Sequence, residues 1–78
     1  MTPPPLRVGV VGTGHWAVEA HIPGFRACSG VEVAAICSRS LERGETVSHA
    51  LGIPRVYTSV PAMVVGERLD LVSIVTPD

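Results

Sequence analysis

Short apolar runs rich in β-branched residues alternate along the chain with segments that carry helical start and stop signals. Residues 6–11, LRVGVV, and residues 31–37, VEVAAIC, are almost wholly apolar. Strands that are covered on both faces of a parallel sheet have this composition. Shorter runs at residues 55–57 and 71–75 predict a third and a fourth strand.

Capping residues and helix breakers place the helical segments between these strands. A glycine cluster opens a helical stretch that runs to about residue 28, in which Pro23 starts a second segment or makes a kink. Ser40 stands at the N-cap of a helix that runs to residue 51, and Gly52 suits the left-handed residue that ends it. A third helix begins after Thr58 or Ser59 and extends to residue 66.

The order of the predicted elements is β-α-β-α-β-α-β. Strands that alternate with helices are joined by right-handed crossovers, which give a parallel sheet with helices on its faces. The sequence therefore predicts the α/β class with a doubly wound plan. Residues 1–5, MTPPP, are expected to be a disordered leader, and residues 6–78 one partial domain.

Composition and charge narrow the classes of partner. A hydrophobic fraction of 46% in 78 residues is enough to bury a core, and the length allows one small domain or part of a larger one. A formal net charge of -1 and a single residue each of Phe, Trp and Tyr argue against nucleic acid and membrane surfaces as partners. Without a metal-ligand motif, a signal peptide or a membrane span, we expect a cytoplasmic protein with no metal site.

A glycine loop follows the first strand directly and precedes the first helix. Gly12, Gly14 and Ala17 form the pattern G-x-G-x-x-A. In such a loop the first glycine allows a tight turn, and the second lets the backbone approach a pyrophosphate. The small third residue lets the helix pack closely on the strand, and the N-terminal end of the helix attracts anions. The loop therefore predicts a dinucleotide-binding site at the carboxyl edge of the sheet.

Two variable positions of this loop, those of His15 and Trp16, are candidate cofactor contacts. Side chains at such positions project toward the phosphates or over the crevice. The indole of Trp16 is suited either to shield a bound cofactor from water or to pack on a neighbouring loop.

The end of the second strand lacks the acid that binds the ribose hydroxyls in sites that prefer NAD. Ser38 and Arg39 stand there instead, and Arg43 follows one helical turn later. The guanidinium of Arg39 can stack on adenine and pair with a 2′-phosphate, and Arg43 can add a second charge. The alternative is that both arginines are solvated residues at the start of a helix. Our hypothesis is that NADP(H) is preferred over NAD(H).

Five stretches in a fixed order resemble one family: RVGVVGTG at 7–14, HIP at 21–23, VEVAAICSR at 31–39, GIPRVY at 52–57 and DLVSIVTP at 70–77. They resemble the N-terminal part of the glucose-fructose oxidoreductase / inositol dehydrogenase / MocA (Gfo/Idh/MocA) family. Many dehydrogenases share the glycine loop alone, whereas the last two stretches are much more specific to this family.

The resemblance implies a Rossmann-like sheet with strand order 3-2-1-4, ending in this chain after the fourth strand. It also implies an oxidoreductase that transfers hydride between a nicotinamide and a sugar, cyclitol or similar polyol. By position, residues 12–16 would line the pyrophosphate, Ser38 and Arg39 the adenosine ribose, and Thr76 and Pro77 the cofactor beyond the fourth strand.

The chain departs from the family in length, because family members continue past the T-P segment with further strands, a Glu-Lys-Pro motif and a large second domain. These 78 residues contain no lysine, so that motif has no counterpart here. We therefore assign no catalytic residue, treat the substrate domain as absent, and expect these 78 residues alone to be inactive. The complete protein would take a small sugar or polyol substrate and form a homo-oligomer. A free-standing, non-catalytic module that binds or senses NADP(H) is the alternative, and a methyltransferase-like nucleotide site is a third.

Overall fold

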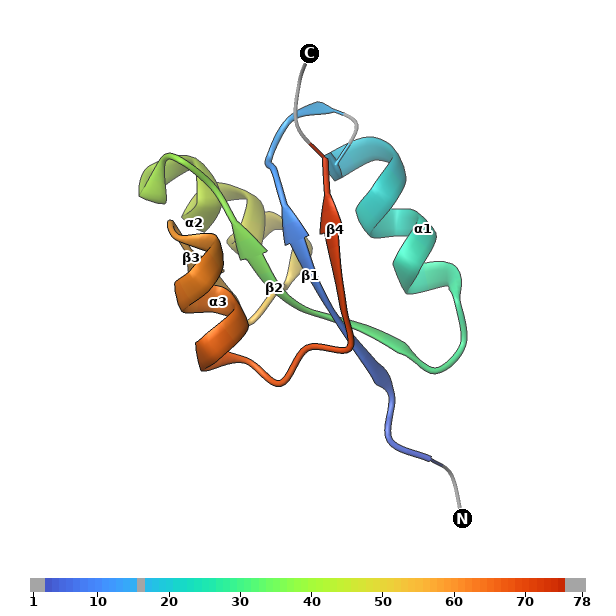
Figure 1. The fold of residues 1–78 in the computed structure, drawn as a ribbon. Coiled ribbons are helices and arrows are strands. Elements are labelled where there is room, and N and C mark those ends of the chain that lie inside the picture. Colours follow the sequence, from blue (N-terminus) through green and yellow to red (C-terminus); the bar gives the residue numbers. More distant parts are fainter. Residues whose placement is uncertain (1–2, 16, 76–78) are drawn as a thin grey trace.

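One parallel sheet forms the centre of the protein in the computed structural model, which describes residues 3–15 and 17–75 (Figure 1). Its order is β3-β2-β1-β4 in this part of the chain. The strands are β1 Leu6–Val11, β2 Val31–Cys37, β3 Arg55–Tyr57 and β4 Leu71–Ile74. This order confirms the predicted fold. Of the four predicted strands only the fourth ends at a different residue, Ile74 instead of residue 75. The N–H of Val75 still donates to the carbonyl of Val11 at 2.8 Å.

The first helical stretch has two parts, as the proline in its sequence predicts. A π-helical turn, η1 Ala17–His21, leads into helix α1 Ile22–Ala27. Pro23 lies in the first turn of α1. Proline is tolerated at that position because the first N–H groups of a helix have no intrahelical acceptor.

Helix α2 Leu41–Leu51 and helix α3 Val60–Gly66 begin and end at residues with capping chemistry. The hydroxyl of Ser40 accepts a hydrogen bond from the N–H of Arg43 at 3.2 Å. Gly52 ends α2 with a φ of 68°, a left-handed conformation that favours glycine. Ser59, and not Thr58, caps α3, because its hydroxyl accepts from the N–H of Ala62 at 3.3 Å. These local signals were therefore sufficient to predict both helix starts.

Helices cover both faces of the sheet. Helices α1 and α2 pack on one face through eight buried residues: Val8, Val10, Ala17, Ile22, Val33, Ile36, Val47 and Ile53. On the opposite face Met63 of α3 packs with Ala35 and Cys37. Because β2 contributes to both clusters, nearly every position along it is apolar, which confirms the interpretation of that run as a strand buried on both sides.

A buried carboxylate ties the end of α3 to two strands. The side chain of Glu67 is 7% exposed, and its carboxylate accepts from the guanidinium of Arg7 at 2.9 Å. It also accepts from the hydroxyl of Tyr57 at 2.6 Å, with the guanidinium of Arg55 3.9 Å away. A buried charge is stable only when it is paired and hydrogen-bonded, and this one is both.

The hydrogen bond from Tyr57 to Glu67 raises the pKa of the phenol. Donation to the carboxylate, followed by burial, raises the pKa of Tyr57 above its ordinary value of 10.0. The stabilisation from this bond is therefore complete below about pH 10, the pKa in the unfolded chain, and is lost as pH rises through the higher folded value. Because the chain has one tyrosine, tyrosinate absorbance should show a midpoint above 10 when folded and near 10 when denatured. Identical midpoints in the two states would contradict the bond.

Residues 3–15 and 17–75 contain no helix with the length and apolarity needed to cross a membrane. The same residues contain no cluster of three or more His, Cys, Asp or Glu side chains placed to hold a metal ion. Both cysteines are free: Cys37 is buried in the sheet, and Cys28 is exposed in the turn after α1.

Candidate functional site

A pocket of about 530 Å³ opens at the carboxyl ends of β1 and β2. It is lined by residues 11–14 of the glycine loop, by residues 37–40 and Arg43, and by Thr58, Val60 and Val75. Parallel α/β sheets bind nucleotides at this edge, next to the strand where the direction of winding reverses. In the order β3-β2-β1-β4 that strand is β1.

Most of the residues predicted to bind a cofactor lie together in this pocket. Gly12, Thr13, Gly14, Ser38, Arg39 and Arg43 all line it. His15 is exposed and is not among the lining residues. Trp16, Thr76 and Pro77 lie outside the described residues.

Gly12 occupies a position where only glycine fits. Its φ is 126°, a conformation that L side chains rarely adopt, and an added Cβ would lie 2.0 Å from the carbonyl oxygen of Val75. Its N–H donates to the carbonyl of Cys37 at 2.9 Å. The first glycine therefore lets the loop pass between the end of β2 and the residue that follows β4.

Gly14 has a different reason to be glycine. A Cβ added there would meet no atom within 4 Å, and the residue is exposed. Its carbonyl accepts from the N–H of Val18 at 3.1 Å and so begins the helical stretch. Nothing in the described protein requires glycine at this position, whereas the approach of a pyrophosphate to the backbone would.

The glycine loop is tied to the end of β2 by two hydroxyls. The Oγ1 of Thr13 and the Oγ of Ser38 are 3.2 Å apart. Ser38 is 6% exposed, and its hydroxyl also accepts from the N–H of Ser40 at 3.3 Å. The hydroxyl that the sequence assigned to the ribose thus also holds the loop, an interaction between side chains far apart in sequence that no local pattern indicates.

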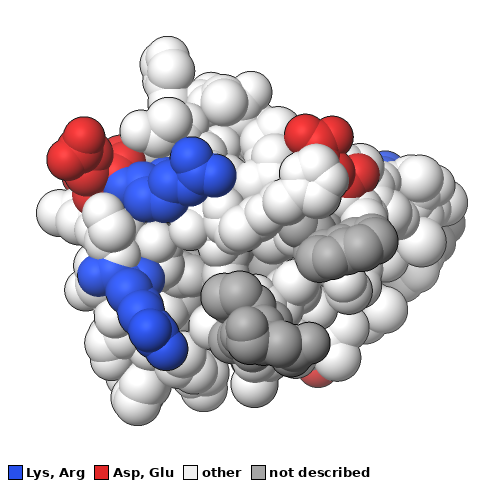
Figure 2. Space-filling model, turned by 90° about the horizontal axis from the view of Figure 1, so that it is seen from above, with Lys and Arg blue, Asp and Glu red and all other residues white. Residues whose placement is uncertain are grey.

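Two basic side chains on this edge have different surroundings. Figure 2, which views the carboxyl edge of the sheet from above, shows basic side chains along one side of the face. Arg39 is exposed and makes no hydrogen bond or ion pair with another described residue. Arg43 donates from Nε and Nη2 to the carbonyl of Thr13, at 3.3 and 3.0 Å. Arg39 is therefore the side chain that is available to a ligand.

The thiol of Cys37, which lines the pocket, is not expected to be reactive. Cys37 lines the pocket and is 4% exposed. Burial raises the pKa of this thiol above its ordinary value of 9.0. The thiolate is the reactive form of cysteine, so Cys37 is not a nucleophile near neutral pH.

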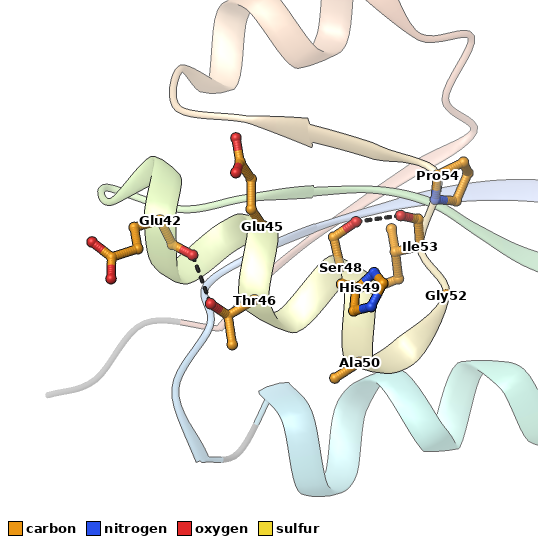
Figure 3. A pocket seen from close by; sticks show the side chains of 9 residues that line it. All are labelled: Glu42, Glu45, Thr46, Ser48, His49, Ala50, Gly52, Ile53 and Pro54. Carbon is orange, nitrogen blue, oxygen red and sulfur yellow. Dashed lines mark hydrogen bonds between the residues drawn. The ribbon is translucent and has the colours of Figure 1, made fainter.

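A larger hollow of about 940 Å³ runs along α2 and the turn that follows it (Figure 3). Two side-chain hydrogen bonds hold the helix and the turn together: Thr46 donates to the carbonyl of Glu42 at 2.9 Å, and Ser48 donates to the carbonyl of Ile53. Glu42 and Glu45 line it, and its described lining has no arginine. Carboxylates repel phosphates, so we assign the nucleotide to the smaller pocket despite the difference in volume.

A family model and solved structures match nearly the whole chain. The family model GFO_IDH_MocA, described as an oxidoreductase family with an NAD-binding Rossmann fold, matches residues 6–78. A 3-ketoreductase from Actinomadura kijaniata, in complex with TDP-benzene and NADP, superposes with a TM-score of 0.80 and 32% identity over 94% of this chain and 23% of that one. An oxidoreductase from Agrobacterium radiobacter, in complex with NAD+, L-tartaric acid and magnesium, superposes with a TM-score of 0.83 and 30% identity over 92% and 21%.

A curated relative has a named reaction. D-xylose 1-dehydrogenase (NADP(+)) 2 from Haloferax volcanii is 40% identical over 73 residues, which are 94% of this chain and 22% of that protein. The chain thus spans about a fifth of the length of the relatives that it matches. The solved relatives include one with NAD+ and one with NADP. Similarity therefore establishes a nicotinamide cofactor as the class of ligand and leaves the choice between the two open.

Proposed function

Because the chain belongs to the oxidoreductase family with the NAD-binding Rossmann fold, we propose that residues 6–78 form the cofactor-binding part of a dehydrogenase for a sugar, cyclitol or similar polyol. One observation carries the proposal: the pocket brings the glycine loop and the exposed side chain of Arg39 to one edge of the sheet. The nicotinamide cofactor would supply the hydride chemistry. The residues of this chain bind and orient it.

Each end of the cofactor has matching residues in this proposal. Residues 12–14 contact the pyrophosphate, with His15 and Trp16 beside it. Ser38 and Arg39 contact the adenosine ribose, and residues 76 and 77 contact the cofactor beyond β4. The open space in front of Gly14 supports the placement of the pyrophosphate, because a ligand can approach the backbone there.

NADP(H) is the preferred cofactor in this proposal. A carboxylate at the end of β2 would repel a 2′-phosphate, and position 38 is a serine. Arg39 is exposed and unpaired within the described residues, so no existing interaction has to be broken before its guanidinium binds the phosphate. Hydrogen bonds between arginine and phosphate are charge-assisted and short, and they are frequently bidentate.

Replacing Arg39 with alanine tests this preference. We expect Arg39→Ala to raise the Kd for NADP+ by about 10- to 100-fold and the Kd for NAD+ by less than about threefold, because only NADP+ carries the 2′-phosphate. Fluorescence or calorimetric titration measures both constants. Arg26→Ala is the matched control, because it removes the same charge from an exposed position of α1 that does not line the pocket. An unchanged ratio of the two constants in Arg39→Ala would contradict the preference.

Turnover separates the proposed enzyme from a module that only binds NADP(H). The protein expressed from its natural gene is mixed with NADP+ and a panel of aldoses, cyclitols and polyols, and absorbance at the wavelength of the reduced nicotinamide is followed. Reduction of NADP+ that depends on one of these compounds supports the dehydrogenase. Tight binding of NADP+ without reduction by any of them would favour the non-catalytic module.

A further inference from the structure

Arg43 connects helix α2 to the glycine loop, 30 residues earlier in the sequence. Its Nε and Nη2 both donate to the carbonyl oxygen of Thr13, at 3.3 and 3.0 Å. The guanidinium therefore approaches the loop with two N–H groups directed at one acceptor. These two hydrogen bonds fix the carbonyl group of Thr13, which belongs to the backbone of the glycine loop.

The peptide that Arg43 holds is the one between Thr13 and Gly14. A peptide group is planar, and in its trans form the C=O and the following N–H point in opposite directions. By binding the carbonyl of Thr13, Arg43 fixes the direction of the N–H of Gly14 as well. It also neutralises part of the negative charge on an oxygen that would repel a pyrophosphate if it faced the pocket.

A second contact holds the same residue from the side of β2. The hydroxyls of Thr13 and Ser38 are 3.2 Å apart, so the side chain of Thr13 is fixed separately from its carbonyl. The capping bond of α2 uses the backbone N–H of residue 43, which donates to Ser40 at 3.2 Å. The side chain of Arg43 is thus free of any role in the cap, and its described hydrogen bonds serve the loop.

We propose that Arg43 is a positioning residue that orients the Thr13–Gly14 peptide for the pyrophosphate, and that it does so equally for NAD+ and NADP+. This proposal rests on the proposed function, since it assumes that a dinucleotide occupies the pocket. Recognition of the 2′-phosphate then belongs to Arg39, whose guanidinium is unpaired within the described residues. Arg43 takes a role different from the second phosphate charge that its position in the sequence suggested.

Two substitutions at position 43 distinguish orientation of the loop from binding of a phosphate. Arg43→Ala removes every side-chain donor. Arg43→Gln removes the charge, but its amide nitrogen is separated from the backbone by the same number of bonds as Nε of arginine, so it can still donate to the carbonyl of Thr13. The Kd values for NAD+ and NADP+ are measured for wild type, both variants and Arg39→Ala in the protein expressed from its natural gene.

We expect Arg43→Ala to raise both Kd values by a similar factor of about three to ten, which leaves their ratio unchanged. Arg43→Gln should bring both values back to within about threefold of wild type. The melting temperature should be the same for wild type and Arg43→Gln, because the residue is exposed and the cap survives. If Arg43 had a purely structural role, Arg43→Ala would instead lower the melting temperature and leave the Kd values of the folded protein for NAD+ and NADP+ unchanged.

Other outcomes would overturn the proposal. If Arg43→Ala weakens NADP+ at least tenfold more than NAD+ and glutamine does not restore it, Arg43 is a ligand of the 2′-phosphate. If neither constant changes, the contact with Thr13 has no role in binding. Should Arg43→Ala fail to fold, the ratio measured for Arg43→Gln decides by the same criterion. Absence of binding of either dinucleotide to the wild-type protein would contradict the proposed function itself, which is a distinct result.

Discussion

Gly12→Ala should destabilise the protein by about 2–6 kcal/mol and abolish dinucleotide binding, the largest effect that we expect for a substitution in the glycine loop. A side chain at a φ of 126° is strained, and its Cβ would lie 2.0 Å from the carbonyl oxygen of Val75. Backbone strain of this kind costs about 1–3 kcal/mol, and forced overpacking adds a similar amount. Because the opposing atom belongs to the backbone, relief requires movement of the segment after β4. Urea denaturation measures the change in the free energy of unfolding, and titration with NADP+ measures the loss of binding.

Gly14→Ala is the matched control for this substitution. A Cβ at Gly14 would meet no described atom within 4 Å, and its φ is not positive. The free energy of unfolding should therefore change by less than about 1 kcal/mol, while the affinity for dinucleotide falls because the methyl group occupies the approach of the pyrophosphate. Equal losses of stability in the two variants would contradict the separate roles of the two glycines.

Glu67→Ala should lower the free energy of unfolding by about 2–4 kcal/mol, the second large effect. The carboxylate of Glu67 is 7% exposed and binds the guanidinium of Arg7 at 2.9 Å. Its removal also leaves the hydroxyl of Tyr57 without the acceptor that lies 2.6 Å away. Breaking a buried ion pair from one side typically costs about 3–5 kcal/mol, and the one-third exposure of Arg7 places the expected value below the top of that range.

Tyr57→Phe separates the hydrogen bond from the ion pair. It removes the hydroxyl and keeps the ring, so we expect a smaller loss of stability by urea denaturation than for Glu67→Ala. The loss of stability for Glu67→Gln should lie between the losses for Tyr57→Phe and Glu67→Ala, because the amide oxygen of glutamine can still accept one hydrogen bond. A loss below about 0.5 kcal/mol for Glu67→Ala, the usual range for surface positions, would show that the carboxylate is solvated in solution.

The strands, the caps and the glycine loop could be predicted because each depends on residues that are neighbours in sequence. Ser40 caps the helix that begins at the next residue, and Gly52 ends the same helix with its own backbone conformation. The glycine loop is visible in the eight consecutive residues 7–14, and its first glycine allows the tight turn after the strand. The close approach of Val75 to Gly12 joins residues far apart in the chain and could not be predicted. The apolar run at residues 31–37 identifies the strand that is buried on both faces.

The contacts that organise the site could not be predicted, because they join residues far apart in the chain. Arg43 reaches Thr13 across 30 positions, and Glu67 reaches Arg7 across 60. Spacing in sequence gives no indication of which acceptor a long, flexible arginine side chain will find. The sequence predicts Arg39 as the main phosphate ligand and Arg43 as a second charge, and only the fold shows that the guanidinium of Arg43 donates to the carbonyl of Thr13.

The central position of β1 has a consequence for how the protein acquires its site during synthesis. The final strand, β4, pairs with β1 in parallel register, for example Val8 with Leu71, across a separation of 63 positions in the chain. Such distant parallel pairing is slow to form, and a nascent chain emerges from the ribosome N-terminal end first. The glycine loop is thus synthesised early, but the close approach of Gly12 and Val75 forms only after residue 75 has been synthesised. Because a dinucleotide would bind this loop in its completed conformation, we expect the cofactor to stabilise the folded protein.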